Sequence, residues 1–265
     1  MSIICPNMSN PDVAREFNEL KAATSERAAY AIWSLNNGNG IDKAPNGAES
    51  KLFNDLLEHY GDRTKAIRAK AKTYSKSFRD WFGDWIGEDK ENVSKVVDGN
   101  GEPLMVYHGS VRTTEEAPSI VNLEYFTTPD IEQAASYTGY RSYKDSNRND
   151  YIRSVFMNLR NPLIIDNERA PFYETKYKGK TINSDALVEL AKKEGYDGFM
   201  LYNTKDFGDN IEAIDETKEI NPSTFAAFNT PNQIKSATDN TGVYSKETLN
   251  IYDDYETISE LNNYD

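Results

Sequence analysis

The spacing of apolar residues changes at Gly87, and this change most constrains what the chain can fold into. Before Gly87, apolar side chains recur every three or four residues, as at Leu52, Phe53 and Leu56, which predicts amphipathic helices. After it, short apolar runs alternate with turn residues, and only two segments keep a helical spacing. Because strands outnumber helices in this second part, we predict an α+β fold rather than a doubly wound parallel sheet.

These patterns divide the 265 residues into a helical module at 1–88, a second domain at 89–250 and an acidic tail at 251–265. The module contains an Asn-, Gly- and Pro-rich loop at 36–49. Its last helix is predicted to carry four aromatic side chains at i, i+3, i+4 and i+7: Phe78, Trp81, Phe82 and Trp85. Aromatic residues at this spacing are more typical of a packed core than of a ligand site.

The second domain is expected to open with a β-hairpin over residues 94–109. One helix is predicted to begin with Pro129 at its first position and to run to about residue 140, and another to span 184–194. Further strands are expected at 151–157, 162–166, 199–203, 224–228 and 233–237.

Composition excludes several classes of function. A net charge of −13 at pH 7 disfavours direct nucleic-acid binding, which depends on Lys and Arg at phosphates. A single cysteine, Cys5, cannot form an internal disulfide, and two histidines are too few for a Cys/His zinc site. The sequence also lacks an apolar run long enough to cross a membrane. We therefore expect an intracellular protein with a protein or small-molecule target.

Four short motifs occur in order along the second domain: YHGS at 107–110, YFT at 125–127, GYDG at 195–198 and NQIKSA at 232–237. In this order they resemble the ADP-ribosyltransferase superfamily. The likeness is to its His-Tyr-Glu branch, which includes poly(ADP-ribose) polymerases and diphtheria-type toxins. The nearest likeness is to the domains of phage and mobile-element polyvalent proteins, and it covers about 150 of the 265 residues. The resemblance implies a mixed, split-sheet fold that uses NAD as co-substrate and no metal.

The resemblance assigns the first motif to nicotinamide recognition. In the family, the histidine bonds a hydroxyl of the nicotinamide ribose, and the backbone of the next residue holds the nicotinamide amide. These roles fall on His108 and Gly109, with Ser110 implied as a further amide contact. Glycine suits this place because a backbone without a Cβ can approach a ligand closely. The competing interpretation of His108 is a histidine that satisfies its hydrogen bonds at a strand end.

Stacking on the nicotinamide ring is implied for Tyr137, while Tyr125 and Phe126 are implied to line the other wall. A good aromatic or cation–π contact of this kind is worth about 1 to 2 kcal/mol. Among the 17 tyrosines of the chain, any single one is more typical of core packing. The place of Tyr137 behind the YFT motif is what distinguishes it.

The family's reaction breaks the bond between ribose C1′ and nicotinamide through an oxocarbenium-like state. Such a state needs negative or acceptor groups near the ribose, and in the family a glutamate on a late strand meets this need by bonding the ribose 2′-hydroxyl. This sequence departs from the pattern, because the matching residue is Gln233. Its amide can still accept from the ribose 2′-hydroxyl, but the charge and a base are lost. The departure implies a mono-transferase or a slow enzyme, with NAD binding without turnover as the alternative.

Other features of the sequence are less informative about function. Asn203 and Asp206 follow the GYDG motif and are interpreted mainly as loop residues, with a border of the acceptor site as the second option. KYKGKT is no phosphate-binding loop, because Glu174 stands where the first glycine is required. A Gly-x-Ser-x-Gly elbow is absent, which argues against a serine hydrolase. Glycosidase chemistry by paired carboxylates stays open, since acidic residues are abundant.

The resemblance predicts that this protein of a phage or mobile element transfers ADP-ribose from NAD to a host macromolecule, with a protein as the favoured acceptor. It would act in the cytoplasm of a bacterial host, with delivery by the virion as one route, and would serve host takeover. Two alternatives remain. In an NAD glycohydrolase, water replaces the acceptor, and in a non-catalytic interaction module only the fold is retained.

Overall fold

The structure, a computed structural model, describes residues 3–112, 125–139, 142, 144, 147–228, 232–245 and 251. It divides into two compact units. The first extends to Leu104 and includes Gly242–Tyr244, and the second begins at Met105. Apart from Ile251, the expected acidic tail at 251–265 lies outside the described residues.

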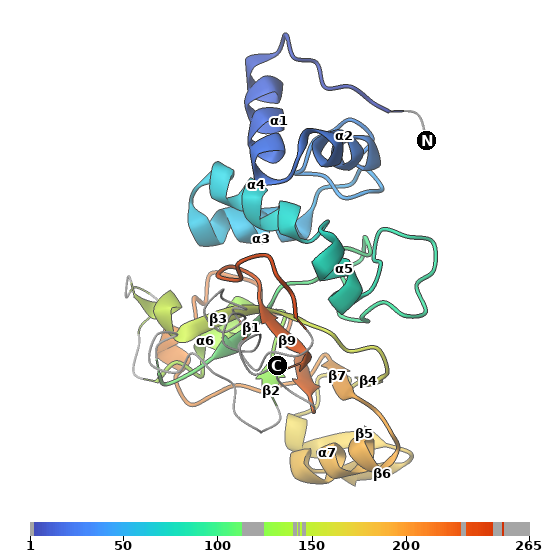
Figure 1. The fold of residues 1–265 in the computed structure, drawn as a ribbon. Coiled ribbons are helices and arrows are strands. Elements are labelled where there is room, and N and C mark those ends of the chain that lie inside the picture. The colour runs from blue at the N-terminus through green and yellow to red at the C-terminus, as the bar shows by residue number, and fades with distance from the viewer. Residues whose placement is uncertain are drawn as a thin grey trace, which may run out of the picture. The chain divides into compact units, whose positions relative to one another are not determined.

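Helices build the first unit, as the periodicity predicts. They are α1 (Pro11–Ala23), α2 (Glu26–Leu35), α3 (Lys51–Tyr60), α4 (Arg63–Lys72) and α5 (Lys76–Phe82), shown in blue to blue-green in Figure 1. Each begins behind a residue whose side chain accepts a hydrogen bond from a backbone N–H of the first turn: Asn10, Ser25, Ser50, Asp62 and Ser75. These caps satisfy donors that a helix start would leave without a partner.

The aromatic helix is shorter than the sequence predicts. It ends at Phe82, because Gly83 adopts a φ of +104°. Gly83 also lies against the backbone of Val93, and a Cβ on this residue would come within 2.5 Å of the Val93 Cα atom. Trp85 therefore lies beyond the helix, and its indole Nε1 donates to the carbonyl of Thr73 at 2.9 Å. The expectation of four aromatics on one helix face was wrong for Trp85, although all four side chains are buried as predicted.

A buried ion pair lies inside this unit. The ammonium of Lys70 is 2.8 Å from a carboxylate oxygen of Glu102, and neither side chain is exposed. Lys70 also donates to the hydroxyl of Ser50 at 2.7 Å and to the carbonyl of Lys43 at 2.9 Å. Burial lowers the pKa of Lys70 and raises the pKa of Glu102, because both charged forms have lost water. The pair therefore holds α4 to the segment that leads into the second unit.

The second unit contains two main sheets. An antiparallel sheet has the order β1 (Val106–Gly109), β3 (Ile152–Met157) and β9 (Ile234–Ser236). The other has the order β2 (Tyr125–Thr127), β8 (Thr224–Ala227), β7 (Gly198–Tyr202) and β4 (Pro162–Asp166). Only β4 and β7 pair in parallel among these strands. The predicted α+β class with a mixed, split sheet is confirmed.

A backbone bridge joins the two sheets near the start of the second unit. Tyr107 and Thr128 form an antiparallel bridge, with reciprocal backbone hydrogen bonds of 2.8 and 2.9 Å. This bridge places the end of β1 beside the end of β2. The expected hairpin at 94–109 is correspondingly reduced to an isolated bridge between Val97 and Pro103, because Val106–Gly109 pairs with β3 instead.

Two helices accompany the sheets, α6 (Ile131–Ala135) and α7 (Ser184–Lys193). Helix α7 and the sheet of β4, β7 and β8 enclose one apolar core: Leu163, Leu187, Val188, Ala191, Phe199, Leu201 and Ala226. Helix α6 starts after Asp130, which caps it, and not at Pro129 as predicted. It also ends before residue 140, because Ser136 and Thr138 hydroxyls bond back to helix carbonyls and Gly139 turns with a φ of +70°.

The remaining elements are short. A hairpin of β5 (Thr175–Tyr177) and β6 (Lys180–Ile182) was not predicted, because its strands of three residues are too brief to show an alternating pattern. Single 3₁₀ turns occur at Arg148–Tyr151, Phe172–Glu174 and Ile211–Ala213. Among the described residues, no helix combines the length and apolarity needed to cross a membrane.

The buried ion pair gives a prediction about stability. Glu102→Gln should lower the free energy of unfolding by about 3 to 5 kcal/mol, because the Lys70 ammonium would stay buried without its carboxylate. Urea denaturation followed by circular dichroism measures this change. Lys76→Ala is the control, since it breaks an exposed pair with Asp80 and should cost about 0.5 kcal/mol or less. Similar losses in the two variants would contradict a structural role for the buried pair.

Candidate active site

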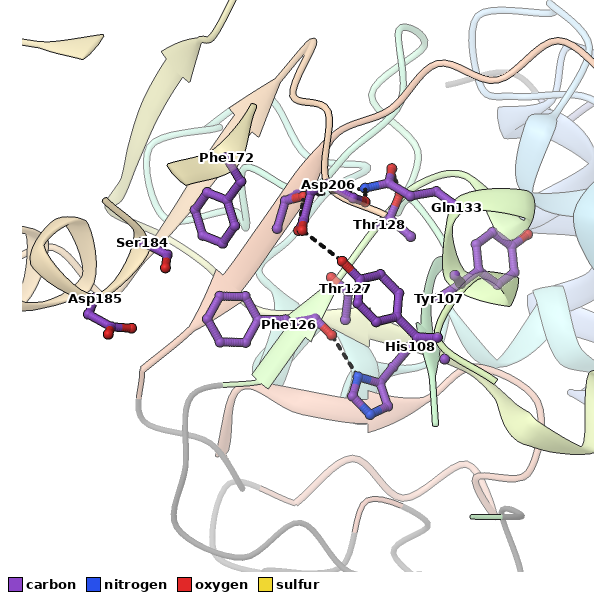
Figure 2. Close-up of a pocket in the computed structure, with 14 residues that line it drawn as sticks. Tyr107, His108, Phe126, Thr127, Thr128, Gln133, Phe172, Ser184, Asp185 and Asp206 are labelled. Carbon is purple, nitrogen blue, oxygen red and sulfur yellow. Dashed lines mark hydrogen bonds between the residues drawn. The ribbon is translucent and has the colours of Figure 1, made fainter. Parts of the chain in front are cut away.

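A cavity of about 340 Å³ opens in the second unit, within the size range of small-molecule sites. Its walls come from the ends of β1 and β2, from α6, from the segment after β7 and from the start of α7, as Figure 2 shows. Its lining residues are Tyr107, His108, Gly109, Phe126, Thr127, Thr128, Gln133, Ala134, Tyr137, Phe172, Ser184, Asp185, Asp206 and Thr224. Four residues singled out from the resemblance are among them: His108, Gly109, Phe126 and Tyr137.

The imidazole of His108 is fixed in one orientation. Its ring stacks on Tyr125 with centroids 4.4 Å apart, and Nδ1 lies 2.7 Å from the carbonyl oxygen of Phe126. Because a carbonyl only accepts, Nδ1 carries the proton and Nε2 presents a lone pair. Burial lowers the pKa of His108; the hydrogen bond to Phe126 opposes this shift in part, and the nearby Arg153 guanidinium adds to it. His108 is therefore a neutral hydrogen-bond acceptor on the cavity wall.

Gly109 allows β1 and α6 to touch. A Cβ on this residue would lie 1.8 Å from the carbonyl oxygen of Ala134 and 3.0 Å from the Cβ of Tyr137. Glycine is thus required by the packing of the helix, in addition to the close approach of a ligand that the resemblance implies. The next residue, Ser110, donates its backbone N–H to Tyr151 at 2.9 Å and does not line the cavity.

Tyr137 lies in the turn after α6 and lines the cavity. Its side chain is 38 % exposed, and its hydroxyl donates to Oδ1 of Asp206 at 2.7 Å. Burial raises the pKa of Tyr137, and the negative charge of Asp206 raises it further. The ring is therefore anchored at its hydroxyl end.

Asp206 belongs to a network that spans three segments. Its second oxygen, Oδ2, accepts from the hydroxyl of Thr224 at 2.8 Å, and its backbone carbonyl accepts from Nε2 of Gln133 at 2.7 Å. Oε1 of Gln133 accepts in turn from the hydroxyl of Thr128 at 2.7 Å and from the N–H of Ser223 at 2.9 Å. These polar groups thus hold the loop after β7 against α6 and β8.

Sequence reasoning did not identify Gln133 or Thr224, and it treated Asp206 mainly as a loop residue. Gln133 precedes Tyr137 by four positions, a spacing that would place both on one face of the helix expected to run to about residue 140. That spacing could have identified Gln133. No local signal distinguishes Thr224 from the other residues of a buried strand, because its hydroxyl contacts an aspartate 18 positions away.

Gln233 lies apart from the cavity lining. Its side-chain Nε2 donates to the carbonyl of Asp197 at 2.9 Å and to that of Asn158 at 3.3 Å, and the residue is 7 % exposed. These bonds join the residue before β9 to the ends of β3 and β7. The structure therefore brings His108, Gly109, Phe126 and Tyr137 together but not Gln233.

A second cavity, of about 700 Å³, shares the Tyr137 side chain with the first. Its lining combines apolar and acidic residues: Val111, Ser136, Tyr137, Gly139, Phe207, Gly208, Asp209, Asn210, Ile211 and Glu212. Within the described part of the chain, no group of three or more His, Cys, Asp or Glu residues is arranged to hold a metal ion.

The comparisons with known proteins give one match. Residues 98–244, more than half of the chain, match the family described as ADP-ribosyltransferase in polyvalent proteins. No curated protein and no solved structure matches the chain. The matched region contains every strand of the two main sheets and every residue that lines the His108 cavity. The chain therefore belongs to the ADP-ribosyltransferase family of polyvalent proteins.

Proposed function

We propose that this domain cleaves the nicotinamide–ribose bond of NAD and transfers ADP-ribose to a macromolecule of a bacterial host, with a protein as the favoured acceptor. The observation that carries the proposal is that His108 and Tyr137, which come from separate elements, line the same cavity. This cavity lies in a chain that belongs to the ADP-ribosyltransferase family of polyvalent proteins. Delivery by a phage or mobile element and action in the host cytoplasm are parts of the same proposal.

The cavity has the groups that the nicotinamide riboside part of NAD requires. The neutral Nε2 of His108 can accept a hydrogen bond from a ribose hydroxyl, since Nδ1 is already bonded to Phe126. The Tyr137 ring offers an aromatic face to the cationic nicotinamide ring. The backbone of Gly109 lines the same cavity, and the absence of a Cβ lets this backbone lie against the Ala134 carbonyl of α6.

The chemistry proposed for the site is a substitution at ribose C1′. The C1′–N bond to nicotinamide breaks, and its electron pair leaves with nicotinamide, which becomes neutral. A new bond forms between C1′ and a nucleophilic atom of the acceptor, whose proton passes to solvent. Residues that hold the ribose and nicotinamide contribute by orientation, which reduces the entropy lost on the way to the transition state.

The second cavity offers the acceptor a route to the reaction centre. It shares Tyr137 with the first cavity, so a molecule bound there would lie beside the ring that we assign to nicotinamide. Exposed apolar side chains at Val111, Phe207 and Ile211 are typical of a surface that binds another macromolecule. A transferase that acts on a macromolecule is therefore favoured over a glycohydrolase that uses water.

The contribution of Gln233 stays a prediction. Its amide lies outside the cavity lining and bonds two backbone carbonyls, which supports a role in holding β9 against its neighbours. Direct contact with the ribose, as the resemblance implies, would require this side chain to leave those partners.

The first test measures label transfer from labelled NAD to a bacterial lysate, together with nicotinamide release. His108→Ala should lower both rates at least about tenfold, because the ribose hydroxyl loses its acceptor. His59→Ala is a matched control on α3, outside the cavity, and should leave both rates within about twofold of the native protein. Nicotinamide release without labelled macromolecules would identify a glycohydrolase. Absence of NAD binding and turnover would leave a non-catalytic module.

A second test separates the ring of Tyr137 from its hydroxyl. Tyr137→Ala should weaken NAD binding about 5- to 30-fold, the equivalent of one stacking contact. Tyr137→Phe keeps the ring and should change the dissociation constant less than about threefold. Equilibrium dialysis with labelled NAD measures both. Equal losses in the two variants would show that the hydroxyl, rather than ring stacking, holds the ligand.

The pH dependence of NAD binding should follow from His108. Protonation of Nε2 would remove the acceptor, and burial lowers the pKa of His108 below its ordinary value of 6.5. Binding that depends on His108 should therefore be constant from about pH 8 to pH 7 and be lost only below 6.5. Dissociation constants across this range, compared with His108→Gln, measure the effect. A loss centred above 6.5 and absent from the Gln variant would contradict the assignment.

A further inference from the structure

The proposed reaction needs a negative charge that Gln233 does not supply. Positive charge develops on the ribose as the C1′–N bond breaks, and a fixed negative group nearby stabilises it most effectively in a site shielded from water. Gln233 is neutral, and its amide bonds the carbonyls of Asn158 and Asp197 outside the cavity lining. A negative charge at this step would come from another residue.

Two of the residues that line the cavity are acidic, Asp206 and Asp185. Figure 2 shows Asp206 and Asp185 at different ends, with Asp185 at the start of α7 beyond the Phe126 and Phe172 rings. Asp206 accepts from the hydroxyl of Tyr137. Asp185 is exposed, whereas Asp206 is half-buried. Since field strength depends on exclusion of water, Asp206 is the better placed carboxylate.

The Asp206 carboxylate is held in place at both oxygens. Oδ1 accepts from the Tyr137 hydroxyl at 2.7 Å, and Oδ2 accepts from the Thr224 hydroxyl at 2.8 Å. Each carboxylate oxygen has two lone-pair sites, so either oxygen can accept a further bond from a ligand hydroxyl. A carboxylate fixed in this way needs little reorganisation when charge develops, which is the condition for electrostatic catalysis.

The backbone around Asp206 is also fixed. Its carbonyl accepts from Gln133, and two residues on, the N–H of Gly208 donates to the Ser136 hydroxyl at 2.8 Å. A Cβ at Gly208 would lie 2.3 Å from the Ser136 carbonyl oxygen, so glycine is needed for this loop to lie against the turn that carries Tyr137. The loop and the stacking residue are thus positioned as one unit.

From this geometry we infer that Asp206 supplies the negative charge that stabilises the ribose cation, in the role that the family's glutamate fills. The inference rests on the proposed function, and it assigns a residue to the step in which the C1′–N bond breaks. Thr224 and Tyr137 act as positioning residues for this carboxylate, because each donates one hydrogen bond to it. The same tyrosine thus holds the nicotinamide ring by its face and the carboxylate by its hydroxyl.

The decisive experiment compares Asp206→Asn with the native protein. The asparagine keeps an oxygen that can accept from Tyr137, but it removes the charge. Nicotinamide release at saturating NAD should fall about 100- to 1,000-fold, while the dissociation constant for NAD changes less than about threefold. Asp166→Asn is the matched control, because Asp166 is an exposed aspartate of the same unit that lines neither cavity, and it should keep the rate within about threefold. Thermal melting of each variant checks that it folds.

The possible outcomes test the role of Asp206 separately from the proposed function. If the native protein and Asp206→Asn release nicotinamide at the same rate, the role of Asp206 is overturned and the proposed function stands. A loss of NAD binding equal to the loss of rate would also overturn it, since that pattern indicates ground-state binding. Absence of release from the native protein would overturn both. If Asp206→Asn fails to fold, Asp206→Glu is compared with Asp206→Gln. These two side chains have the same size and differ in charge, and only the charged glutamate variant should retain activity.

Discussion

The site depends on the close contact between the end of β1 and the last turn of α6. Gly109 lies so near the Ala134 carbonyl that a Cβ would approach it to 1.8 Å, which no other residue type tolerates. This contact places the histidine that precedes Gly109 and the tyrosine that follows α6 on the same cavity. The bridge between Tyr107 and Thr128 fixes the other side, because it joins β1 to the chain that enters α6. Backbone packing therefore sets the relative positions of β1, β2 and α6 at the cavity.

Polar side chains supply the cavity with a hydrogen-bond acceptor and a carboxylate. His108 is oriented by one ring and one carbonyl, and burial keeps it neutral, so it can only accept through Nε2. Asp206 is oriented by two hydroxyls, which leaves its charge near the Tyr137 ring. A neutral acceptor and a fixed carboxylate are suited to different parts of a ribosyl group: the first binds a hydroxyl and the second stabilises a cation.

The family match covers the domain that carries this cavity and leaves most of the helical unit outside it. The helical unit has its own core, capped helices and a buried ion pair, all of which are features of a stable domain. The chain carries a net charge of −13 at pH 7, and the acidic residues Asp209 and Glu212 are among those that line the second cavity.

The sequence by itself determined the helices of the first unit, most strands of the second, the α+β class and the family. These follow from local patterns, such as capping residues, apolar periodicity and short motifs, which depend on neighbouring residues. It also pointed to His108 and Gly109, which stand in one contiguous motif, and to Tyr137, which follows the YFT motif at 125–127. The tertiary structure decided the length of α6, the end of α5 before Trp85 and the position of Gln233. It alone joined Tyr137 to Asp206 across 69 positions and Gln133 to Ser223 across 90. Such contacts leave no local pattern, because the folded chain brings together residues that share no sequence neighbourhood.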